Sequence, residues 1–212
     1  MRPAICQRAD ARSDGGGKKA FFLPGQALAV SVAESYASIY SESTSATISA
    51  IRLDRVATAM DALNDLSDAL SAGIASRALR DRIRETLFYD VEDFYSTPGD
   101  LAIDLGDLGL VVARDYDIAD AAAAALSAAV GEAVITSASG AANPRASGLS
   151  VHLVPLRGDG TAETSHDEDY FRGSAAEHSL SFVDASTWVP RLPEGPGLLH
   201  RLFYDTMSFS GN

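Results

Sequence analysis

Apolar residues recur at helical spacing in several stretches of this chain, and the segments between them have strand or turn character. Within Gln26–Tyr40, the apolar positions Leu28, Val32 and Tyr36 follow one another every four residues. This spacing places them on one face of a helix, so we predict an amphipathic helix there. Ala46–Leu53 combines isoleucines with a β-branched threonine and predicts a strand.

Two further helices are expected on either side of Gly73, a residue that can end a helix. The first begins at Asp54, whose carboxylate is a natural N-cap. The second begins near Ser76 and alternates arginines with acids on its outer face, which is typical of a solvated surface. We expect the two to form an antiparallel hairpin over a sheet. Their inward positions are Val56, Met60, Leu63, Leu66 and Leu70 in the first helix, and Leu79, Ile83 and Leu87 in the second.

The middle of the chain is acidic and rich in turns before it becomes helical again. Val91–Asp107 contains a Pro-Gly pair, and we expect Leu101–Leu105 to lead into a short helix near Leu108–Ala113. Ile118–Glu132 is rich in alanine, which favours helix intrinsically and lets neighbouring elements approach closely. The sequence therefore predicts a short helix followed by a longer one.

Strands are expected on both sides of a loop at 139–147. Ala133–Ser137 predicts a short strand, and Gly148–Leu156 is nearly continuous in apolar residues, which is typical of a strand buried on both faces. Helices and strands in this order predict an α/β fold. The expected organisation is an irregular segment at 1–25, an α/β region at 26–192 and a tail at 193–212.

Composition narrows the class of protein. The 212 residues are 46% hydrophobic, enough for a substantial core, and no run of 18 apolar residues could cross a membrane as a helix. The formal net charge of −12 argues against a nucleic-acid backbone or an anionic membrane surface as the main partner. Residues 1–8 are charged and no apolar stretch follows them, so they do not predict a secretory signal.

The reactive side chains do not form a recognisable catalytic pattern. The single cysteine, Cys6, excludes an intrachain disulfide, and no predicted strand or helix beside it would supply a base and an oxyanion donor. The chain contains no Gly-x-Ser-x-Gly elbow. His152 falls on the predicted buried strand, where we expect a structural role. His178 and His200 have no partner that the sequence identifies.

The acidic loop Gly158–Asp169 is the candidate for cation binding. Its His166-Asp167-Glu168-Asp169 run is dense in the ligand atoms that hard cations prefer. Calcium loops, however, need ligands at regular alternate positions around a glycine turn, and this spacing differs. We therefore expect a solvated loop, and the residues alone assign no catalytic, cofactor-binding or metal-ligating position.

Several segments follow one another in a distinctive order. They are Thr47–Ile51 (Thr-Ile-Ser-Ala-Ile), Leu63–Leu66 (Leu-Asn-Asp-Leu), Asp104–Leu108 (Asp-Leu-Gly-Asp-Leu), Gly148–Val151 with Pro155 after it, and Trp188 further on. In this order, over about residues 27–192, the chain resembles the C-terminal half of clostripain-family cysteine peptidases, which belong to the caspase-like clan. The resemblance implies a partial caspase-like sandwich: a mixed sheet flanked by helices, with a helical hairpin and a C-terminal extension.

The resemblance does not extend to a catalytic centre. In that family a catalytic His and Cys lie at adjacent strand ends of a mostly parallel sheet, the Cys follows an Asp-Ala pair, and an acidic pocket favours a basic residue before the cleaved bond. This chain contains no Asp-Ala-Cys and no His-Gly, and Cys6 follows Ala4 and Ile5. The resemblance therefore assigns no catalytic residue here. It implies export as a frequent location, and calcium as a candidate cofactor without an assignable site.

Three functions stay open from sequence. The chain is the supporting part of a clostripain-like cysteine endopeptidase, inactive alone because the catalytic His and Cys belong to other polypeptide. Its partner is then that catalytic half, or a protein or peptide substrate. Alternatively it is a non-catalytic binding or scaffold domain of the same origin, or an unrelated α/β protein with an acidic cation-binding loop. Half a sheet leaves a strand edge and an apolar face exposed, so the first function predicts binding to the missing half.

Overall fold

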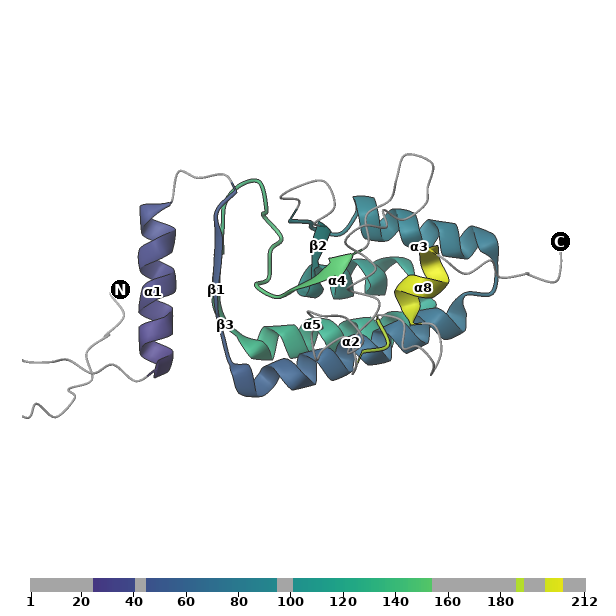
Figure 1. Ribbon diagram of the computed structural model, residues 1–212, viewed down its shortest axis with the longest axis horizontal. Coiled ribbons are helices and arrows are strands. Elements are labelled where there is room, and N and C mark those ends of the chain that lie inside the picture. The colour runs from purple at the N-terminus through teal and green to yellow at the C-terminus, as the bar shows by residue number, and fades with distance from the viewer. Residues whose placement is uncertain (1–24, 41–44, 95–100, 154–185, 189–196, 204–212) are drawn as a thin grey trace, which may run out of the picture.

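The computed structural model of the chain combines helices with short strands (Figure 1). It describes residues 25–40, 45–94, 101–153, 186–188 and 197–203. Its elements are α1 (Gly25–Ile39), β1 (Thr47–Ile51), α2 (Leu53–Gly73), α3 (Arg77–Tyr89), β2 (Leu101–Asp104), α4 (Leu105–Asp115), the 3₁₀ turn η1 (Asp117–Ala119), α5 (Asp120–Ala133), β3 (Val134–Ser139), β4 (Ser150–Leu153) and α8 (Leu198–Phe203).

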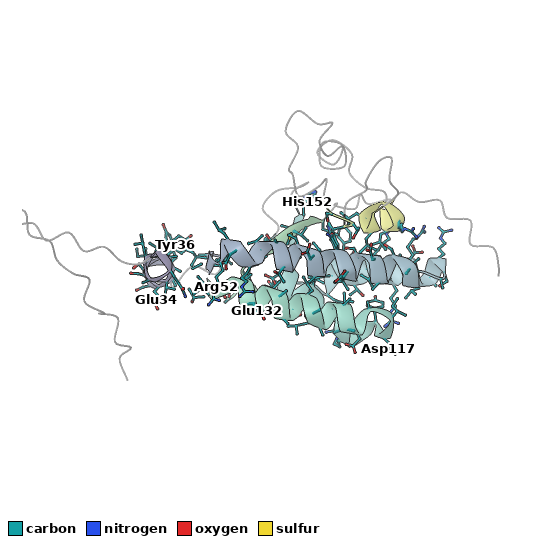
Figure 2. All side chains as sticks on the ribbon, turned by 90° about the horizontal axis from the view of Figure 1, so that it is seen from below. Glu34, Tyr36, Arg52, Asp117, Glu132 and His152 are labelled. Carbon is teal, nitrogen blue, oxygen red and sulfur yellow. The ribbon has the colours of Figure 1, made fainter. Side chains whose placement is uncertain are left out.

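One end of the molecule is a small layered unit, which we call the α1–β1–β3 lobe (residues 25–40, 45–51 and 134–139). β1 and β3 pair antiparallel, with a register irregularity between Ala50 and Ile51. α1 lies along this pair on the side away from the other helices (Figure 1). Figure 2 shows α1 end-on, beside the ends of α2 and α5. The lobe therefore projects from the helical body.

Three helices form the main layer of the body, with α2 against α5 and α5 against α4. Small residues bring α4 and α5 close together. A Cβ added at Gly109 would lie 2.6 Å from the carbonyl oxygen of Ala123 and would overlap the hydroxyl of Ser127. That hydroxyl donates a hydrogen bond to the carbonyl of Gly106 at 3.1 Å. Gly109 is thus needed for this helix contact.

A second antiparallel pair, β2 with β4, lies within the body. It aligns Ile103 with Val151. The other edge of β2 is also occupied, because Asp93 forms a bridge with Ile103 and the amide of Phe94 donates to the carbonyl of Ala102 at 2.8 Å. β2 is therefore the central strand of a three-segment arrangement, flanked by 92–94 and by β4.

A single hydrophobic core joins α2, α3, α4 and α5 to the β2–β4 pair and to α8. Trp188 is fully buried in it, and its indole N–H donates to the carbonyl of His152 on β4 at 3.0 Å. Other fully buried large side chains are Leu63, Leu66, Leu70, Ile83, Leu87, Ile103, Leu105, Leu108, Leu126, Leu153 and Leu198.

The predicted α/β class is confirmed, but the described strands do not form one mixed sheet. They form two separate antiparallel pairs.

The strand at 148–156 was predicted to be buried on both faces, and this is wrong for its described residues. Ser150 is exposed and His152 is half-buried, whereas Val151 and Leu153 are buried. One face of β4 is covered by the core and the other is not. The chain turns back between α2 and α3 (Figure 1), but the expected packing of these helices as a hairpin over a sheet is wrong, because α2 lies along α5.

Helix starts differ from prediction in two places. Arg52 occupies the N-cap of α2 and makes no side-chain cap bond, whereas Asp54 lies in the first turn, where its negative charge favours the helix dipole. The predicted helix at 108–113 begins earlier, at Leu105, because Asp104 accepts the amide of Asp107 and caps it. The predicted start of α3 near Ser76 is confirmed, and the Ser76 hydroxyl caps the helix by accepting the amide of Leu79 at 3.2 Å.

Replacing Gly109 with alanine is expected to destabilise the protein by about 1–3 kcal/mol, because the new methyl group overpacks the α4–α5 contact. Gly131→Ala in α5 is the matched control, since a Cβ there meets no atom within 4 Å. Alanine at that position should stabilise the helix by about 0.5–1 kcal/mol. Urea unfolding of both variants measures the difference, and equal stabilities would contradict the packing described.

Candidate functional site

Asp104 joins the end of β2 to the segment that leads into β4. Its carboxylate is fully buried. One oxygen, Oδ1, accepts the amide of Asp107 at 2.9 Å and the hydroxyl of Ser147 at 2.6 Å. The other, Oδ2, accepts the amides of Ser147 at 2.7 Å and Gly148 at 3.3 Å. A single side chain therefore both caps α4 and fixes the chain at 147–148.

Asp107 provides a second buried carboxylate one helical turn further on. Its Oδ2 accepts the amide of Glu92 at 2.6 Å and the guanidinium Nε of Arg145 at 3.1 Å. Its position in the first turn of α4 also favours its negative charge through the helix dipole. Asp107 thus holds together three segments that are distant in the sequence.

Glu92 is the third buried carboxylate, and it binds the loop before β4. Its oxygens accept the side-chain amide of Asn143 at 3.3 Å and the backbone amide of Arg145 at 3.1 Å. The Nε of Arg145 lies 3.5 Å from Glu92 Oε2. The same guanidinium donates to the carbonyl of Asp90 at 2.9 Å.

We call Glu92, Asp104, Asp107, Arg145 and Ser147 the carboxylate clamp. Two of its three buried carboxylates, Glu92 and Asp107, face the guanidinium of Arg145, whose side chain is 52% exposed. Backbone amides and a hydroxyl satisfy the oxygens that the guanidinium does not reach, which is how buried charge is tolerated. Because each of these carboxylates is already hydrogen-bonded, the clamp is built to fix the 143–148 loop.

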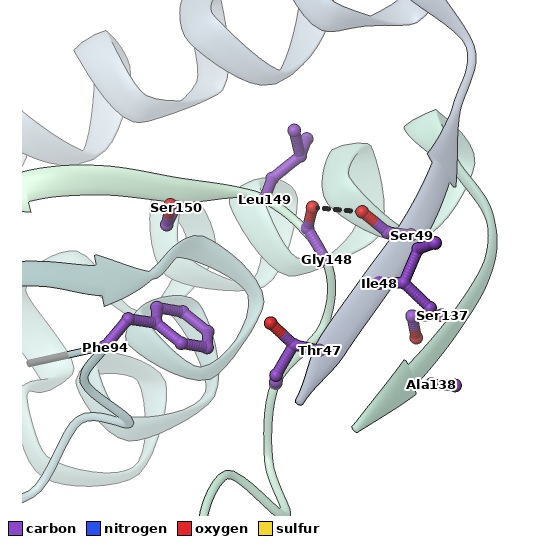
Figure 3. A pocket seen from close by; sticks show the side chains of 10 residues that line it. Thr47, Ile48, Ser49, Phe94, Ser137, Ala138, Gly148, Leu149 and Ser150 are labelled. Atoms are coloured by element: carbon purple, nitrogen blue, oxygen red, sulfur yellow. Dashed lines mark hydrogen bonds between the residues drawn. The ribbon is translucent and has the colours of Figure 1, made fainter. Parts of the chain in front are cut away.

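A cavity of about 210 Å³ lies between the β1–β3 pair and the end of this loop (Figure 3). The hydroxyl of Ser49 donates to the carbonyl of Gly148 at 2.9 Å across its inner end. Gly148 has a φ of +114°, which disfavours any side chain. A Cβ there would lie 2.8 Å from the Cβ of Ser49. The lining residues are Thr47, Ile48, Ser49, Phe94, Ser137, Ala138, Ala146, Gly148, Leu149 and Ser150.

A second, more open cavity of about 510 Å³ lies between α3 and the end of α4. Both basic and acidic side chains line this second cavity. The guanidinium of Arg114 donates to Asp115 at 2.6 Å, and this bond holds the pKa of that carboxyl below its usual value. Burial raises the pKa of the nearby Tyr116, whose hydroxyl lies 2.7 Å from Thr86 Oγ1. The cavity is lined by Arg82, Glu85, Thr86, Tyr89, Asp90, Arg114 and Asp115.

Of the residues that the sequence offered for chemistry, the structure describes His152 and His200. His152 lies on β4, where it is half-buried and its backbone carbonyl accepts the indole N–H of Trp188. His200 lies on α8. Cys6, His166 and His178 lie outside the described residues, and so does the acidic loop Gly158–Asp169. Within the described ranges, no group of three His, Cys, Asp or Glu side chains could hold a metal ion, and no helix is long and apolar enough to span a membrane.

The carboxylate clamp was not predicted from the sequence. The spacing of Asp104 and Asp107 was the available signal, because an Asp three residues before another acid is a helix-start pattern. Nothing in the sequence pattern paired these residues with Glu92 or Arg145, which come from separate loops. Comparison of the chain with protein-family models, with curated proteins and with solved structures finds no match.

Removing the guanidinium with Arg145→Ala is expected to lower the free energy of unfolding by about 2–4 kcal/mol, because Glu92 and Asp107 stay buried without a cation. The control Arg114→Ala removes an arginine from an exposed pair and should leave stability unchanged within error. Denaturant unfolding measures both.

A second substitution tests whether Arg145→Ala destabilises the protein by unbalancing the buried charge or by removing packed atoms. Asp107→Asn keeps an acceptor for the Glu92 amide and removes one negative charge, so it should recover part of the stability of Arg145→Ala. Additive losses in this double-mutant cycle would contradict the charge coupling between Arg145 and Asp107.

Proposed function

We propose that this chain is the C-terminal, supporting part of a clostripain-like cysteine endopeptidase, with a partial caspase-like sandwich, and that it does not cleave peptides by itself. The catalytic His and Cys belong to polypeptide outside this chain. By its resemblance to the family, the complete enzyme cleaves after basic residues.

One observation carries this proposal: three segments of the resemblance, Thr47–Ile51, Asp104–Leu108 and Gly148–Val151, meet at Gly148. The Thr47–Ile51 segment reaches it through the Ser49 hydroxyl at 2.9 Å. The Asp104–Leu108 segment reaches it through the carboxylate of Asp104, which accepts its amide at 3.3 Å. The third segment begins at Gly148 itself. Segments that define a shared architecture are expected to contact one another, and these do so through side-chain bonds that depend on their residue types.

Two further contacts support the same proposal. Asn64, within the Leu63–Leu66 segment, accepts the hydroxyl of Ser186 at 3.1 Å and the amide of Thr187 at 2.8 Å. These bonds position Trp188, which in turn binds the carbonyl of His152. The quoted segments therefore form one connected framework.

The hydrogen bonds of this framework favour a structural role for the chain over a catalytic one. The carboxylates of the clamp are occupied by amides, a hydroxyl and a guanidinium, and the hydroxyl of Ser49 is a donor to backbone. A nucleophile needs a base within hydrogen-bond reach and a donor set for the oxyanion. Within the part of the chain that the structure describes, no cysteine is present to serve as that nucleophile.

The purified chain is expected to show no cleavage of fluorogenic arginyl or lysyl peptides above a buffer control. The measurement should be repeated with a Cys6→Ser variant of equal purity. Cleavage by the original chain that disappears with Cys6→Ser would place a catalytic thiol in this chain and overturn the proposal.

The reading frame upstream of Met1 gives a second, independent test. An in-frame Asp-Ala-Cys preceded by a histidine is the expected result for a peptidase whose reactive segment is encoded there. An upstream region that encodes neither motif, together with an inactive chain, would favour the binding or scaffold domain instead.

A further inference from the structure

The cavity between α3 and the end of α4 is lined by charged groups of both signs, and the proposed peptidase function does not use it. Its volume is about 510 Å³, within the roughly 300–1,000 Å³ that is usual for small-molecule sites. One wall is the face of α3 on which Arg82, Glu85 and Tyr89 follow one another at helical spacing. Another wall is formed by Arg114 and Asp115. Both helices also belong to the common core, which holds the two walls together.

Arg114 and Asp115 neutralise each other. Two nitrogens of the Arg114 guanidinium donate to the two oxygens of Asp115 at 2.8 and 2.6 Å. The bond to Arg114 holds the pKa of Asp115 below its usual value, and the nearby charge of Arg82 adds to this effect. A bidentate pair of this kind engages both carboxylate oxygens. The remaining charges of the cavity, on α3 and on Asp90, are therefore the ones that a ligand meets.

The guanidinium of Arg82 is held in place without use of its hydrogen bonds. Its central carbon lies 5.5 Å from the centre of the Tyr116 ring, a contact in which the ring attracts the cation. The Tyr116 hydroxyl is in turn fixed by Thr86 at 2.7 Å. Among the residues that the structure describes, no acceptor binds the N–H groups of Arg82. Arg82 is thus an oriented donor for a carboxylate.

Two carboxylates of the cavity also lack a partner in the described part of the chain. Glu85 lies one turn after Arg82 on α3, and Asp90 follows the end of that helix. The backbone carbonyl of Asp90 accepts the guanidinium of Arg145, but its carboxylate bonds to no described residue. The groups left for a ligand are therefore one cation and two anions, beside the ring of Tyr89, which is 80% exposed.

We propose that this cavity binds a basic α-amino acid, free arginine or lysine, whose carboxylate pairs with Arg82 and whose two cationic groups pair with Glu85 and Asp90. Such a molecule carries one negative and two positive charges at neutral pH. This is the complement of the charges that the cavity leaves without a partner. The exposed ring of Tyr89 adds an aromatic surface that favours cations. The inference does not rest on the proposed peptidase origin.

The charge pattern argues against simpler ligands. An isolated anion such as phosphate meets one guanidinium and two carboxylates, so repulsion outweighs attraction. A diamine pairs with both carboxylates but brings a further cation toward Arg82. A basic residue within a peptide has lost its α-ammonium group, its carboxylate or both to peptide bonds. Of these ligands, the free amino acid alone matches all three groups.

Binding at this site is expected to be weak. The cavity is open to solvent, so each contact between charges is screened and contributes little. Three such contacts with one small molecule correspond to a dissociation constant in about the millimolar range. The affinity should fall as the salt concentration rises, because salt screens exposed charges.

Chemical-shift titration of the isotopically labelled full chain with arginine and with agmatine tests the site. Agmatine is arginine without its carboxylate. General attraction to a chain of net charge −12 favours agmatine, which has the larger positive charge. The proposed site favours arginine, because only arginine pairs with Arg82, and we expect arginine to bind about tenfold or more tightly. Norleucine, which lacks the side-chain charge of lysine, should bind more weakly than lysine.

Two variants of equal charge locate the site. Arg82→Gln should lower the affinity for arginine to that for agmatine and should not weaken agmatine binding. Arg77→Gln is the matched control, because Arg77 lies on the same helix, is 78% exposed and does not line the cavity. It should leave the preference for arginine unchanged. Glu85→Gln should weaken the binding of both ligands.

The comparison of arginine with agmatine on the unaltered chain decides the proposal even if a variant fails to fold. Agmatine that binds as tightly as arginine would overturn the proposal, since it would show attraction to an acidic surface. Arginine binding that Arg82→Gln leaves unchanged would overturn it as well, and so would the absence of binding by both arginine and lysine.

Discussion

The fold depends most on the buried carboxylate of Asp104. It caps α4, accepts the amides of Ser147 and Gly148 and binds the hydroxyl of Ser147. These bonds bring together a strand end, a helix start and the beginning of another strand, which are separated by some forty residues of chain. A carboxylate that is buried and fully hydrogen-bonded tolerates little change in geometry, since each lost partner leaves charge without solvation.

The rest of the clamp extends this constraint to the 143–148 loop. Asp107 and Glu92 share the guanidinium of Arg145, and Asn143 adds bonds to Glu92 and to the carbonyl of Asp93. More acid than base is buried here, so the clamp contributes geometric specificity rather than a large net stability. By fixing the loop, the clamp holds Gly148 against Ser49. This contact in turn positions the β1–β3 pair against the helical body.

The sequence predicted the helices well because their apolar positions follow a period that local geometry dictates. The start of α3 near Ser76 was predicted correctly, whereas the start of α2 was placed two residues too late, at Asp54, because the actual N-cap residue, Arg52, provides no capping side chain. Strand pairing was not predictable, since partners such as Ile103 and Val151 are distant in sequence. The same holds for the clamp, whose members come from loops without periodic pattern.

The described residues of the molecule thus divide into an acidic body and the α1–β1–β3 lobe, in which Glu34 is the one charged side chain among the residues that the structure describes. Nothing in the described body supplies a reactive thiol, and the function we propose places that chemistry in other polypeptide. Intact mass after incubation with an arginyl acyloxymethyl ketone tests this central claim most directly, because covalent capture requires a thiol assembled with its base and substrate pocket. We predict an unchanged mass, under conditions where iodoacetamide still labels Cys6. A single ketone adduct on Cys6 would contradict the account.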